Sequence, residues 1–349
     1  MEAVRPEVEE LRQRTGQSDN PLLCLDFFLG RVRLFPRDRP VLLLVRSQGR
    51  LEGVVYLYEK MIFGIRTGYL RGFDHLTGES SVIAQEQLRA SLLQVAVHQL
   101  FIQTRVRVAW ATVCQGREKS FTTLEQVRPY LRVEASSLSR EHRLKLDKTF
   151  DATLSRFGAH TRRNLRYYRR RAEKDLNASF HPELGQEESQ EAFNHLKKGC
   201  FQPFPDSVAD WWKMDGLLRT RPGYFAMGLR ASGEWISYLV GIRTGKLTYV
   251  LMQVNHNGFS RYSLSTVMRS YFFEHEILSG QSEIKFVNGT CALFQRCCEL
   301  DTCVTVSARR GLTALVIFNW IAPWYSAPDH ALNMRRWTTR PESLVEPVA

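Results

Sequence analysis

The sequence predicts an α/β (α+β) protein built from two domains of one type that lie side by side. The first observation is the length of 349 residues, which is enough for two ordinary domains. The second is the composition, because 44% hydrophobic and 24% charged residues are typical of a globular protein with a sizeable core. The third is a succession of strand, turn, strand, strand, loop and helix that occurs once in each half of the chain.

In the first half, two apolar runs from residues 41 and 51 are joined by Ser47, Gln48 and Gly49, which is the length of a hairpin turn. The other elements predicted in this half are a charged helix at about 4–14, a strand or short helix at 21–28, a strand at 67–73, a helix at about 83–102 and a strand at 105–113. Residues 115–141 have weak periodicity, and we expect a linker between the halves there.

In the second half, strands from residue 224 onward are separated by turns at Ser232–Gly233 and at Gly245, as in the first half. The elements predicted before them are a short helix ending near 158, a basic helix to about 175, a strand at 177–181 and helices at 187–198 and 208–219. The matching order of elements indicates an internal duplication.

The clearest single unit runs from residue 247 to residue 289. It contains a strand at 247–254, a polar turn, a helix at about 264–278 and a strand at 283–287. Ser263 or Ser265 can cap the first turn of that helix, and Arg261 lies just upstream. A helix start with free amides, hydroxyls and an arginine suits a phosphate group, whereas the alternative is a plain N-cap beside a solvated charge.

The formal net charge of +12 and the pI of about 9.5 predict attraction to nucleic acid, an acidic membrane surface or a phosphorylated cofactor. Much of the charge lies within residues 156–174, where Tyr167 and Tyr168 interrupt a run of arginines. Such a run suits a nucleic-acid backbone, with the tyrosines as stacking groups. We favour instead a solvated helix face that lines an acceptor cleft for an anionic substrate, with Leu165, Tyr168 and Ala172 as the buried stripe.

The first residues mix acidic and basic side chains without an apolar segment, so we expect no secretory signal and a cytoplasmic protein. The longest apolar run, at 312–325, is too short to span a bilayer. The seven cysteines include no C-x-x-C pair and no histidines at zinc-site spacing, and we expect reduced thiols and no metal.

Three stretches together resemble the GNAT acyltransferases, and more narrowly the tandem-GNAT group of bacterial cellulose-biosynthesis acetyltransferases (BcsL/CelD-like), distantly similar to Fem-type transferases. Residues 154–174 resemble a basic segment, residues 230–255 resemble a hairpin, and NGFSRYSLSTVMRSYFFEHEI at 257–277 resembles a "Y-S-P-G-x-L-L" loop and helix. The resemblance covers about residues 40–310. It implies two tandem GNAT-like domains, each a mixed, mostly antiparallel twisted sheet flanked by helices.

The implied boundaries are an N-terminal degenerate domain at 1–140, an acyltransferase domain at 141–325 and a tail at 326–349. The implied activity is acyl transfer from acetyl-CoA or another acyl-CoA. The implied acceptor is an amine or hydroxyl of a small molecule or of a polysaccharide or cell-envelope precursor. The alternatives are a Fem-like transferase that uses aminoacyl-tRNA, in which RNA is a partner, and a catalytically inactive GNAT-fold binding protein.

In GNAT folds the loop and helix after the fourth strand hold the pyrophosphate of coenzyme A, and the fourth and fifth strands splay to admit its pantetheine arm. The resemblance implies that backbone groups of Gln253 and Val254 face the pantetheine. The residues implied to face the phosphates are Arg261, Tyr262, Ser263, Ser265 and Thr266.

Catalysis would need a base for the attacking group and a donor for the departing thiolate. We predict His256 as the base, with Tyr249 and Asn288 flanking the cleft. The family commonly has an aspartate on the fifth strand and a later Tyr-Lys pair, where this chain has Lys285 and Phe294-Gln295. This departure predicts a different substrate or weakened catalysis.

Overall fold

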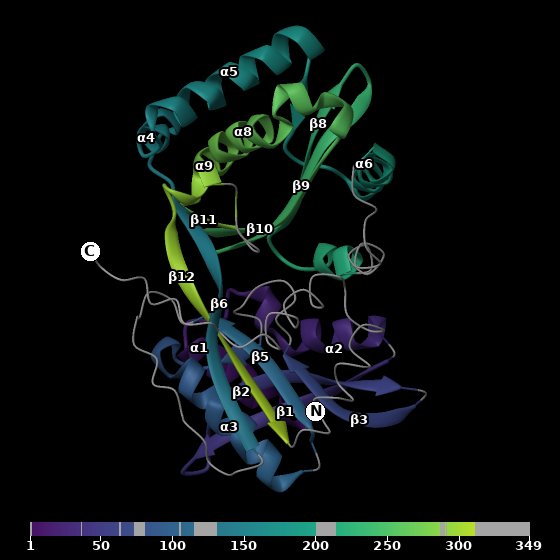
Figure 1. Ribbon diagram of the computed structural model, residues 1–349, viewed down its shortest axis with the longest axis vertical. Helices are drawn as coiled ribbons and strands as arrows, with labels where there is room; N and C mark the ends of the chain where they lie inside the picture. Colours follow the sequence, from purple (N-terminus) through teal and green to yellow (C-terminus); the bar gives the residue numbers. More distant parts are fainter. Residues whose placement is uncertain are drawn as a thin grey trace, which may run out of the picture.

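A computed structural model of the protein describes residues 2–35, 37–62, 64–72, 81–104, 106–114, 131–199, 214–286, 290 and 292–310. Its central feature is one twelve-stranded sheet, with strands from both halves of the chain (Figure 1). The strands are β1 (Asp38–Ser47), β2 (Arg50–Ile62), β3 (Ile65–Gly72), β4 (Val82–Ile83), β5 (Val108–Cys114), β6 (Leu131–Lys145), β7 (Ser179–His181), β8 (Tyr224–Ala231), β9 (Glu234–Thr244), β10 (Leu247–Asn255), β11 (Glu283–Phe286) and β12 (Glu299–Arg310).

Helices pack on both faces of this sheet. The α-helices are α1 (Arg5–Arg14), α2 (Leu25–Leu34), α3 (Arg89–Gln103), α4 (Phe150–Ser155), α5 (Ala159–Leu176), α6 (Gln186–Gly199), α8 (Leu264–Leu278) and α9 (Ala292–Gln295), and residues 214–219 are also helical. The 3-10 helices are η1 (Glu2–Val4), η2 (Pro21–Leu23), η3 (Glu86–Leu88) and η4 (Asn257–Tyr262). Among the described helices, none has both the length and the apolar character needed to cross a membrane.

The predicted internal repeat is confirmed by the strand pairings. In the first unit β1, β2 and β3 are antiparallel, α3 follows, and β5 returns parallel to β3. In the second unit β8, β9 and β10 are antiparallel, α8 follows, and β11 returns parallel to β10. A parallel pair needs a crossover connection, and the helix supplies it in each unit.

The two units exchange their last strands. β6 follows β5 along the chain, yet it pairs with β11 of the second unit. β12 follows β11, yet it pairs with β5 of the first unit. Because β6 and β12 also pair with each other, they join both units into one sheet of order β1-β2-β3-β5-β12-β6-β11-β10-β9-β8-β7, with β4 beside β2 (Figure 1).

The exchange corrects the part of the predicted linker at 115–141 that the structure describes, and residues 115–130 lie outside the described residues. Residues 131–141 form most of β6 and pair with β12, while β11 pairs with residues 142–145 of the same strand. Weak periodicity in the sequence does not distinguish a strand with a mixed set of side chains from a loop. β6 also runs across residue 140, the expected domain boundary, and the division at that point stays a prediction.

Two further element predictions change. The helix expected at 83–102 begins at Arg89, because Val82 and Ile83 pair with β2 as the short strand β4. The stretch at 21–28, which fitted a strand or a helix, is helical, as η2 and the start of α2. Asn20 accepts the Leu22 amide and so caps η2.

Both predicted hairpin turns are confirmed, and both need left-handed backbone. Gln48 and Gly49 have φ of 49° and 78°, and Ser232 and Gly233 have φ of 51° and 87°. Positive φ at both central residues is the geometry that matches the twist of the flanking strands. The glycines adopt it without strain.

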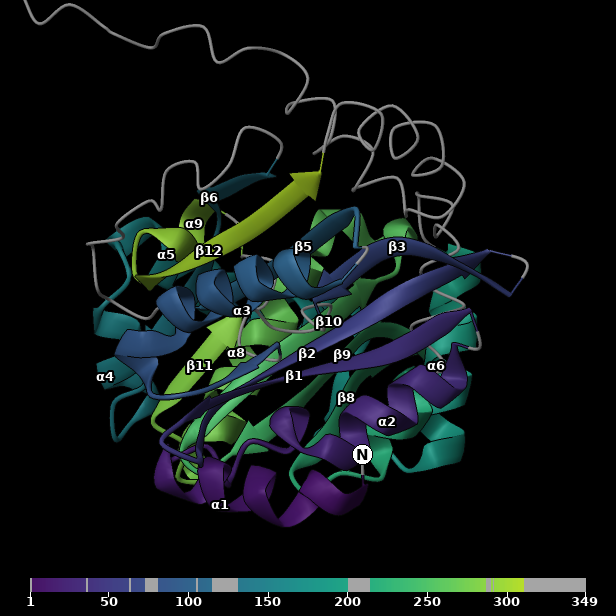
Figure 2. The same ribbon diagram turned by 90° about the horizontal axis from the view of Figure 1, so that it is seen from below.

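The core has three parts that follow the layers. The first cluster lies between α3 and one face of β2, and it includes Val55 and Leu57 of that strand. The second cluster lies on the other face of β2, where Val54 and Tyr56 face α1 and α2 (Figure 2). This second cluster also includes Tyr249 of β10, so it joins the two units. The third lies between the second unit's strands and the helices α5 and α8.

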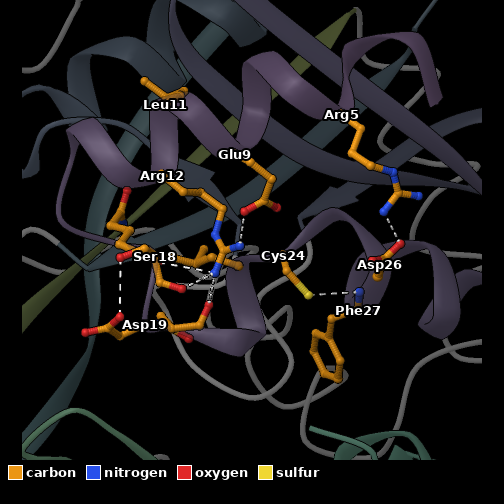
Figure 3. Close-up of polar contacts among 12 residues, drawn as sticks. Arg5, Glu9, Leu11, Arg12, Ser18, Asp19, Cys24, Asp26 and Phe27 are labelled. Carbon is orange, nitrogen blue, oxygen red and sulfur yellow. Dashed lines mark hydrogen bonds and ion pairs between the residues drawn. The ribbon is translucent and has the colours of Figure 1, made fainter. Parts of the chain in front are cut away.

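Arg12 ties the α1–α2 connection together (Figure 3). Its guanidinium is 5% exposed and donates to the carbonyls of Ser18 and Asn20 at 2.7 and 2.8 Å. Glu9 accepts from the same side chain at 2.5 Å. A buried arginine is stable only with such partners, so these bonds hold the chain that leads into α2.

Candidate functional site

The candidate site lies along β10 from its last described pair with β11 onward. The described parallel register runs from Leu247 opposite Glu283 to Val250 opposite Phe286, and β10 continues to Asn255. A bulge between Val250 and Met252 shifts the register of β10 against β9 at the same level. A bulge bends a strand and increases its twist, so β10 changes direction at this point.

α8 begins beside the end of β10, and Glu276 in its last turn anchors the other end of the helix to the start of β10. The Glu276 carboxylate is fully buried and accepts from Arg243 of β9 at 2.7 Å and from the Thr248 hydroxyl of β10. A buried carboxylate needs such a partner set to stay charged. The apolar face of α8, including Val267 and Phe272, packs against the same strands.

The first turn of α8 differs from the predicted cap. Ser263 is the N-cap residue, but its φ is 50°, and its side chain caps no amide. Its Oγ lies 2.9 Å from the Thr266 hydroxyl, and its carbonyl accepts the amides of Thr266 and Val267. The predicted hydroxyl cap is therefore wrong, because the left-handed backbone at Ser263 turns the side chain toward Thr266.

The structure brings the predicted phosphate-facing residues together at this turn, but their side chains differ in how far they are exposed to solvent. Arg261 is exposed, and the side chains of Ser263, Ser265 and Thr266 are partly exposed. Tyr262 is only 3% exposed, and its ring packs in the core while its hydroxyl accepts from Arg261 at 3.1 Å. Phosphate contact by these residues stays a prediction.

Gln253 and Val254 lie on the part of β10 beyond its last described pair with β11, and they pair with Leu239 and Tyr238 of β9. Val254 is buried in the cluster that joins the two units. The Gln253 side chain donates to Asn255 at 3.3 Å and to the Ser265 carbonyl at 3.5 Å. These bonds bridge the end of β10 to the first turn of α8, so the strand and the helix start form one local structure.

His256, the predicted base, caps η4. Its Nδ1 accepts the Gly258 amide at 3.1 Å, which places the proton of the neutral ring on Nε2. The ring also stacks on His195 of α6, with centroids 5.8 Å apart, and meets Phe259 edge-on. For His256 to accept a proton, the bond to Gly258 has to open, so its catalytic role stays a prediction.

Tyr249 and Lys285 form the most distinctive pair of the site. They are directly opposite in the parallel register, one residue before the last described pair, and are 2% and 0% exposed. The Lys285 ammonium lies 5.9 Å from the centre of the Tyr249 ring. Ile284 and Phe286 face α8, so by alternation Lys285 faces the opposite side, toward the core that joins the two units.

In the sequence, Lys285 is notable only because it occupies the position where the GNAT group commonly has an aspartate. Its burial depends on β6 and β10 on either side, which sequence periodicity does not reveal. A lysine between the apolar Ile284 and Phe286 of the strand EIKF was the available signal, because a lysine is rarely fully buried unless it is paired. Asn288, the third predicted catalytic residue, lies outside the described residues.

A buried polar network supports α6 next to the site. The Tyr238 hydroxyl lies 2.6 Å from the Ser189 hydroxyl, and Arg219 bonds both Ser189 and Asp215. Tyr224 donates to Asp215 at 2.7 Å. Burial raises the pKa of Tyr238 to about 12 and also raises the pKa of Tyr224, so both hydroxyls stay protonated and act as donors rather than bases.

Among the described residues, no group of three or more histidine, cysteine, aspartate or glutamate side chains is arranged to hold a metal ion. The polar groups of this site come from the turn before α8, the backbone of β10 and the pair Tyr249 and Lys285. They include backbone groups, hydroxyls, the buried Lys285 and the exposed Arg261.

Comparison with known proteins shows the fold. No family model matches the sequence, and no curated protein matches it. Among solved structures, FemX superposes with a TM-score of 0.54 at 9% identity, covering 86% of this chain and 95% of FemX. Likeness at this identity extends to the fold alone.

Two other solved structures align over similar lengths. L-PGS from Bacillus licheniformis has a TM-score of 0.49 at 11% identity and covers 91% of this chain and 94% of that one. A tandem GNAT protein from the clavulanic acid biosynthesis pathway has a TM-score of 0.48 at 13% identity and covers 89% and 96%. The chain is an α+β protein of two tandem GNAT-like units, as its strand order also shows.

Proposed function

We propose that this protein is an acyl-CoA-dependent acyltransferase that moves an acyl group, acetyl in the first instance, to an amine or hydroxyl. The observation that carries this proposal is the bulge of β10 after Val250, which lies at the last described pair with β11, and the start of α8 beside the end of β10. We expect backbone groups on the β11 side of β10 beyond this bulge to bind an extended amide-containing arm. The helix start and Arg261 can bind the phosphates at its other end.

The reaction would be a direct transfer. The acceptor nitrogen or oxygen attacks the thioester carbonyl, its proton passes to a base or to water, and the carbon–sulfur bond breaks to release the coenzyme A thiolate. Lys285 adds a positive charge on the side of β11 that faces the core between the units. That charge would stabilise the negative charge that develops on the carbonyl oxygen or the departing sulfur.

The finer parts of the proposal rest on the sequence resemblance. We propose membership of the BcsL/CelD-like group, a cytoplasmic location, and a small-molecule, polysaccharide or cell-envelope precursor as the acceptor. The proposed second domain begins near residue 141 with the segment that includes α5. The active site would therefore belong to the second unit, with the first unit closing the core behind Tyr249.

Calorimetric titration with acetyl-CoA tests the donor. We expect binding by the wild-type chain, and at least about tenfold weaker binding by Ser265→Glu, because a carboxylate at the helix start repels the phosphates. Ser265→Gln is the matched neutral control and should bind like the wild type. A carboxylate in the first turn does not destabilise a helix, so the variant should remain folded.

A chain that is folded by circular dichroism and gives no heat with acetyl-CoA would contradict the proposal. If binding is found, release of free thiol in the presence of a panel of amines and sugars identifies the acceptor class. Binding with no thiol release for any acceptor would support the inactive binding protein instead.

A further inference from the structure

α5 carries seven cationic side chains, and the structure divides them into two groups. Four have partners: Arg162 donates to the Phe157 carbonyl at 2.7 Å, Arg166 pairs with Asp151 at 2.6 Å, Arg169 pairs with Glu274 at 2.6 Å and Arg171 pairs with Asp175 at 3.4 Å. The other three are Arg163, Arg170 and Lys174, for which the described residues provide no ion pair or hydrogen bond.

These three cations lie on one line of the helix. At 100° per residue, Arg163, Tyr167, Arg170 and Lys174 fall on the side opposite Leu165 and Ala172, which are fully buried against the rest of the protein. We call these four residues the crest of α5. All four are exposed, and the three cations span about 16 Å along the helix axis at 1.5 Å per residue.

The crest lies at one end of the long axis of the molecule. α5 packs outside α8, and among the described elements it is the outermost at that end (Figure 1). An open hollow of about 770 Å³ follows this face, and all of its described lining residues belong to α5. In the part of the chain that the structure describes, this surface is therefore a straight, cationic face formed by one helix.

We propose that the crest of α5 docks the protein on an anionic phospholipid surface. A flat sheet of phosphate groups can reach all three unpaired cations at once, because they share one line at the edge of the molecule. Tyr167 is 52% exposed among them, and tyrosine side chains favour the headgroup level of a bilayer. The apolar stripe of α5 faces the protein, so the contact is peripheral and electrostatic rather than inserted.

The shape of the crest favours lipid over RNA. Single-stranded nucleic acid is bound in grooves whose walls supply several stacking platforms, whereas the crest has one exposed aromatic ring and the described residues around it add no groove wall. Double-stranded RNA has a deep, narrow major groove that side chains do not enter. A planar anionic surface has neither requirement.

Docking would place the candidate site next to the membrane. Arg171, on the flank of the crest, donates to the Arg261 carbonyl at 3.4 Å, and its guanidinium lies 5.0 Å from the centre of the Tyr262 ring. The turn before α8 is thus connected directly to α5. Docking does not depend on the proposed acyl-CoA chemistry, and the two can fail separately.

Vesicle co-sedimentation of the full chain at about 0.1 M salt tests the proposal, with phosphatidylcholine vesicles that contain or lack roughly a third of phosphatidylglycerol. We expect binding only to the anionic vesicles. The triple variant Arg163→Gln, Arg170→Gln, Lys174→Gln should bind about a hundredfold more weakly, since each cation near an anionic surface contributes about a fivefold factor.

The matched control is Arg33→Gln, Arg37→Gln, Arg107→Gln, which removes three exposed arginines of the first unit. Both variants lower the net charge of +12 by the same amount, so only the position of the charge differs. The control should bind the anionic vesicles like the wild type. Acetyl-CoA titration of the crest variant should be unchanged, which separates docking from the donor site.

Three results would overturn the proposal. These are equal loss of binding in the two variants, no binding of the wild type to anionic vesicles, or retention of a tRNA probe at the same salt without vesicle binding. The last result would assign the crest to RNA. Circular dichroism of both variants verifies folding, which we expect to be intact because every substituted residue is exposed.

Discussion

His256 illustrates how one hydrogen bond changes the interpretation of a residue. Histidine is a residue type that commonly serves as a base, and its place at the end of β10 is the reason why the sequence predicts it as the base here. In the structure its Nδ1 accepts the Gly258 amide, as an N-cap does. The ring therefore has a structural task at the start of η4 that sequence spacing did not indicate.

Two substitutions of His256 separate the structural task from catalysis. His256→Ala should lower the free energy of unfolding by about 1 kcal/mol, as loss of an N-cap does. His256→Asn restores a capping acceptor without an imidazole, so it should recover stability and keep the transfer rate. Urea denaturation and a thiol-release assay measure the two effects, and a rate lost in the asparagine variant would establish His256 as the base.

Lys285 is the residue from which we expect the larger catalytic effect. Lys285→Met keeps a long side chain and removes the charge, and replacing a buried charge with an apolar side chain is often neutral for stability. If the ammonium stabilises negative charge in the transition state, kcat should fall about a hundredfold while acetyl-CoA affinity is kept. Steady-state kinetics measures kcat, and calorimetry on the same variant measures the affinity for acetyl-CoA.

The outcome that would contradict this role is a variant with normal kcat. Lys285→Arg provides the matched comparison, because it retains the charge in a different shape. Partial recovery of kcat by arginine would show that charge is the property that matters at this position. Equal loss in both variants, with unchanged folding, would point to packing against Tyr249.

At the scale of elements, α8 connects the site to the sheet. The helix was predicted at about 264–278, and the structure has it at Leu264–Leu278. Its apolar positions repeat with helical spacing, which is why the prediction was accurate. The partners of its buried Glu276 were not predictable, because Arg243 and Thr248 reach that carboxylate from two other elements, the strands β9 and β10.

The last turn of α8 gives a pH prediction. Burial lowers the pKa of His275 from its ordinary value of 6.5, so the folded protein binds this proton less readily than the unfolded chain. The resulting contribution to stability is complete above pH 6.5 and is lost as the pH falls through the lowered pKa. The urea midpoint should therefore decrease on acidification below pH 6.5, and His275→Gln should reduce this decrease.

The exposed His160 on α5 supplies the control for this experiment. His160→Gln should leave the acid decrease as it is in the wild type. Identical curves for wild type and His275→Gln would mean that other groups account for the pH dependence. Because the comparison uses differences between variants, the contributions of the remaining histidines to the pH dependence cancel.

At the scale of the whole molecule, the exchanged strands make the two units interdependent. β12 pairs with β5 of the first unit and with β6, which continues the sheet into the second. Neither unit has a complete sheet without a strand from the other half of the chain. We therefore expect the two units to unfold together.

A proline in the middle of β12 tests this dependence. Val306 pairs with Ala111 on one side and with Ala135 on the other, so Val306→Pro disturbs a central strand. We expect a loss of about 3 kcal/mol or more, and faster hydrogen exchange in both β2 and β9. Val306→Thr keeps the amide and is the control. Faster exchange confined to β2 would show that the units unfold independently.

The sequence by itself determined the order of elements, the repeat and the position of the helix that follows β10. These are local properties, because apolar spacing and turn residues act over a few positions along the chain. The departure at Lys285 was also visible in the sequence, although its meaning was not.

Only the tertiary structure decided which strands are exchanged, which arginines of α5 have partners and what surrounds Lys285. The strand β6 has neighbours that are far from it in sequence, and residues 131–141 therefore looked like a linker. Likewise, Arg169 and Arg163 are equivalent in sequence, but Arg169 meets Glu274 of α8. Pairing and burial depend on elements that meet only in the folded chain, so local pattern does not contain them.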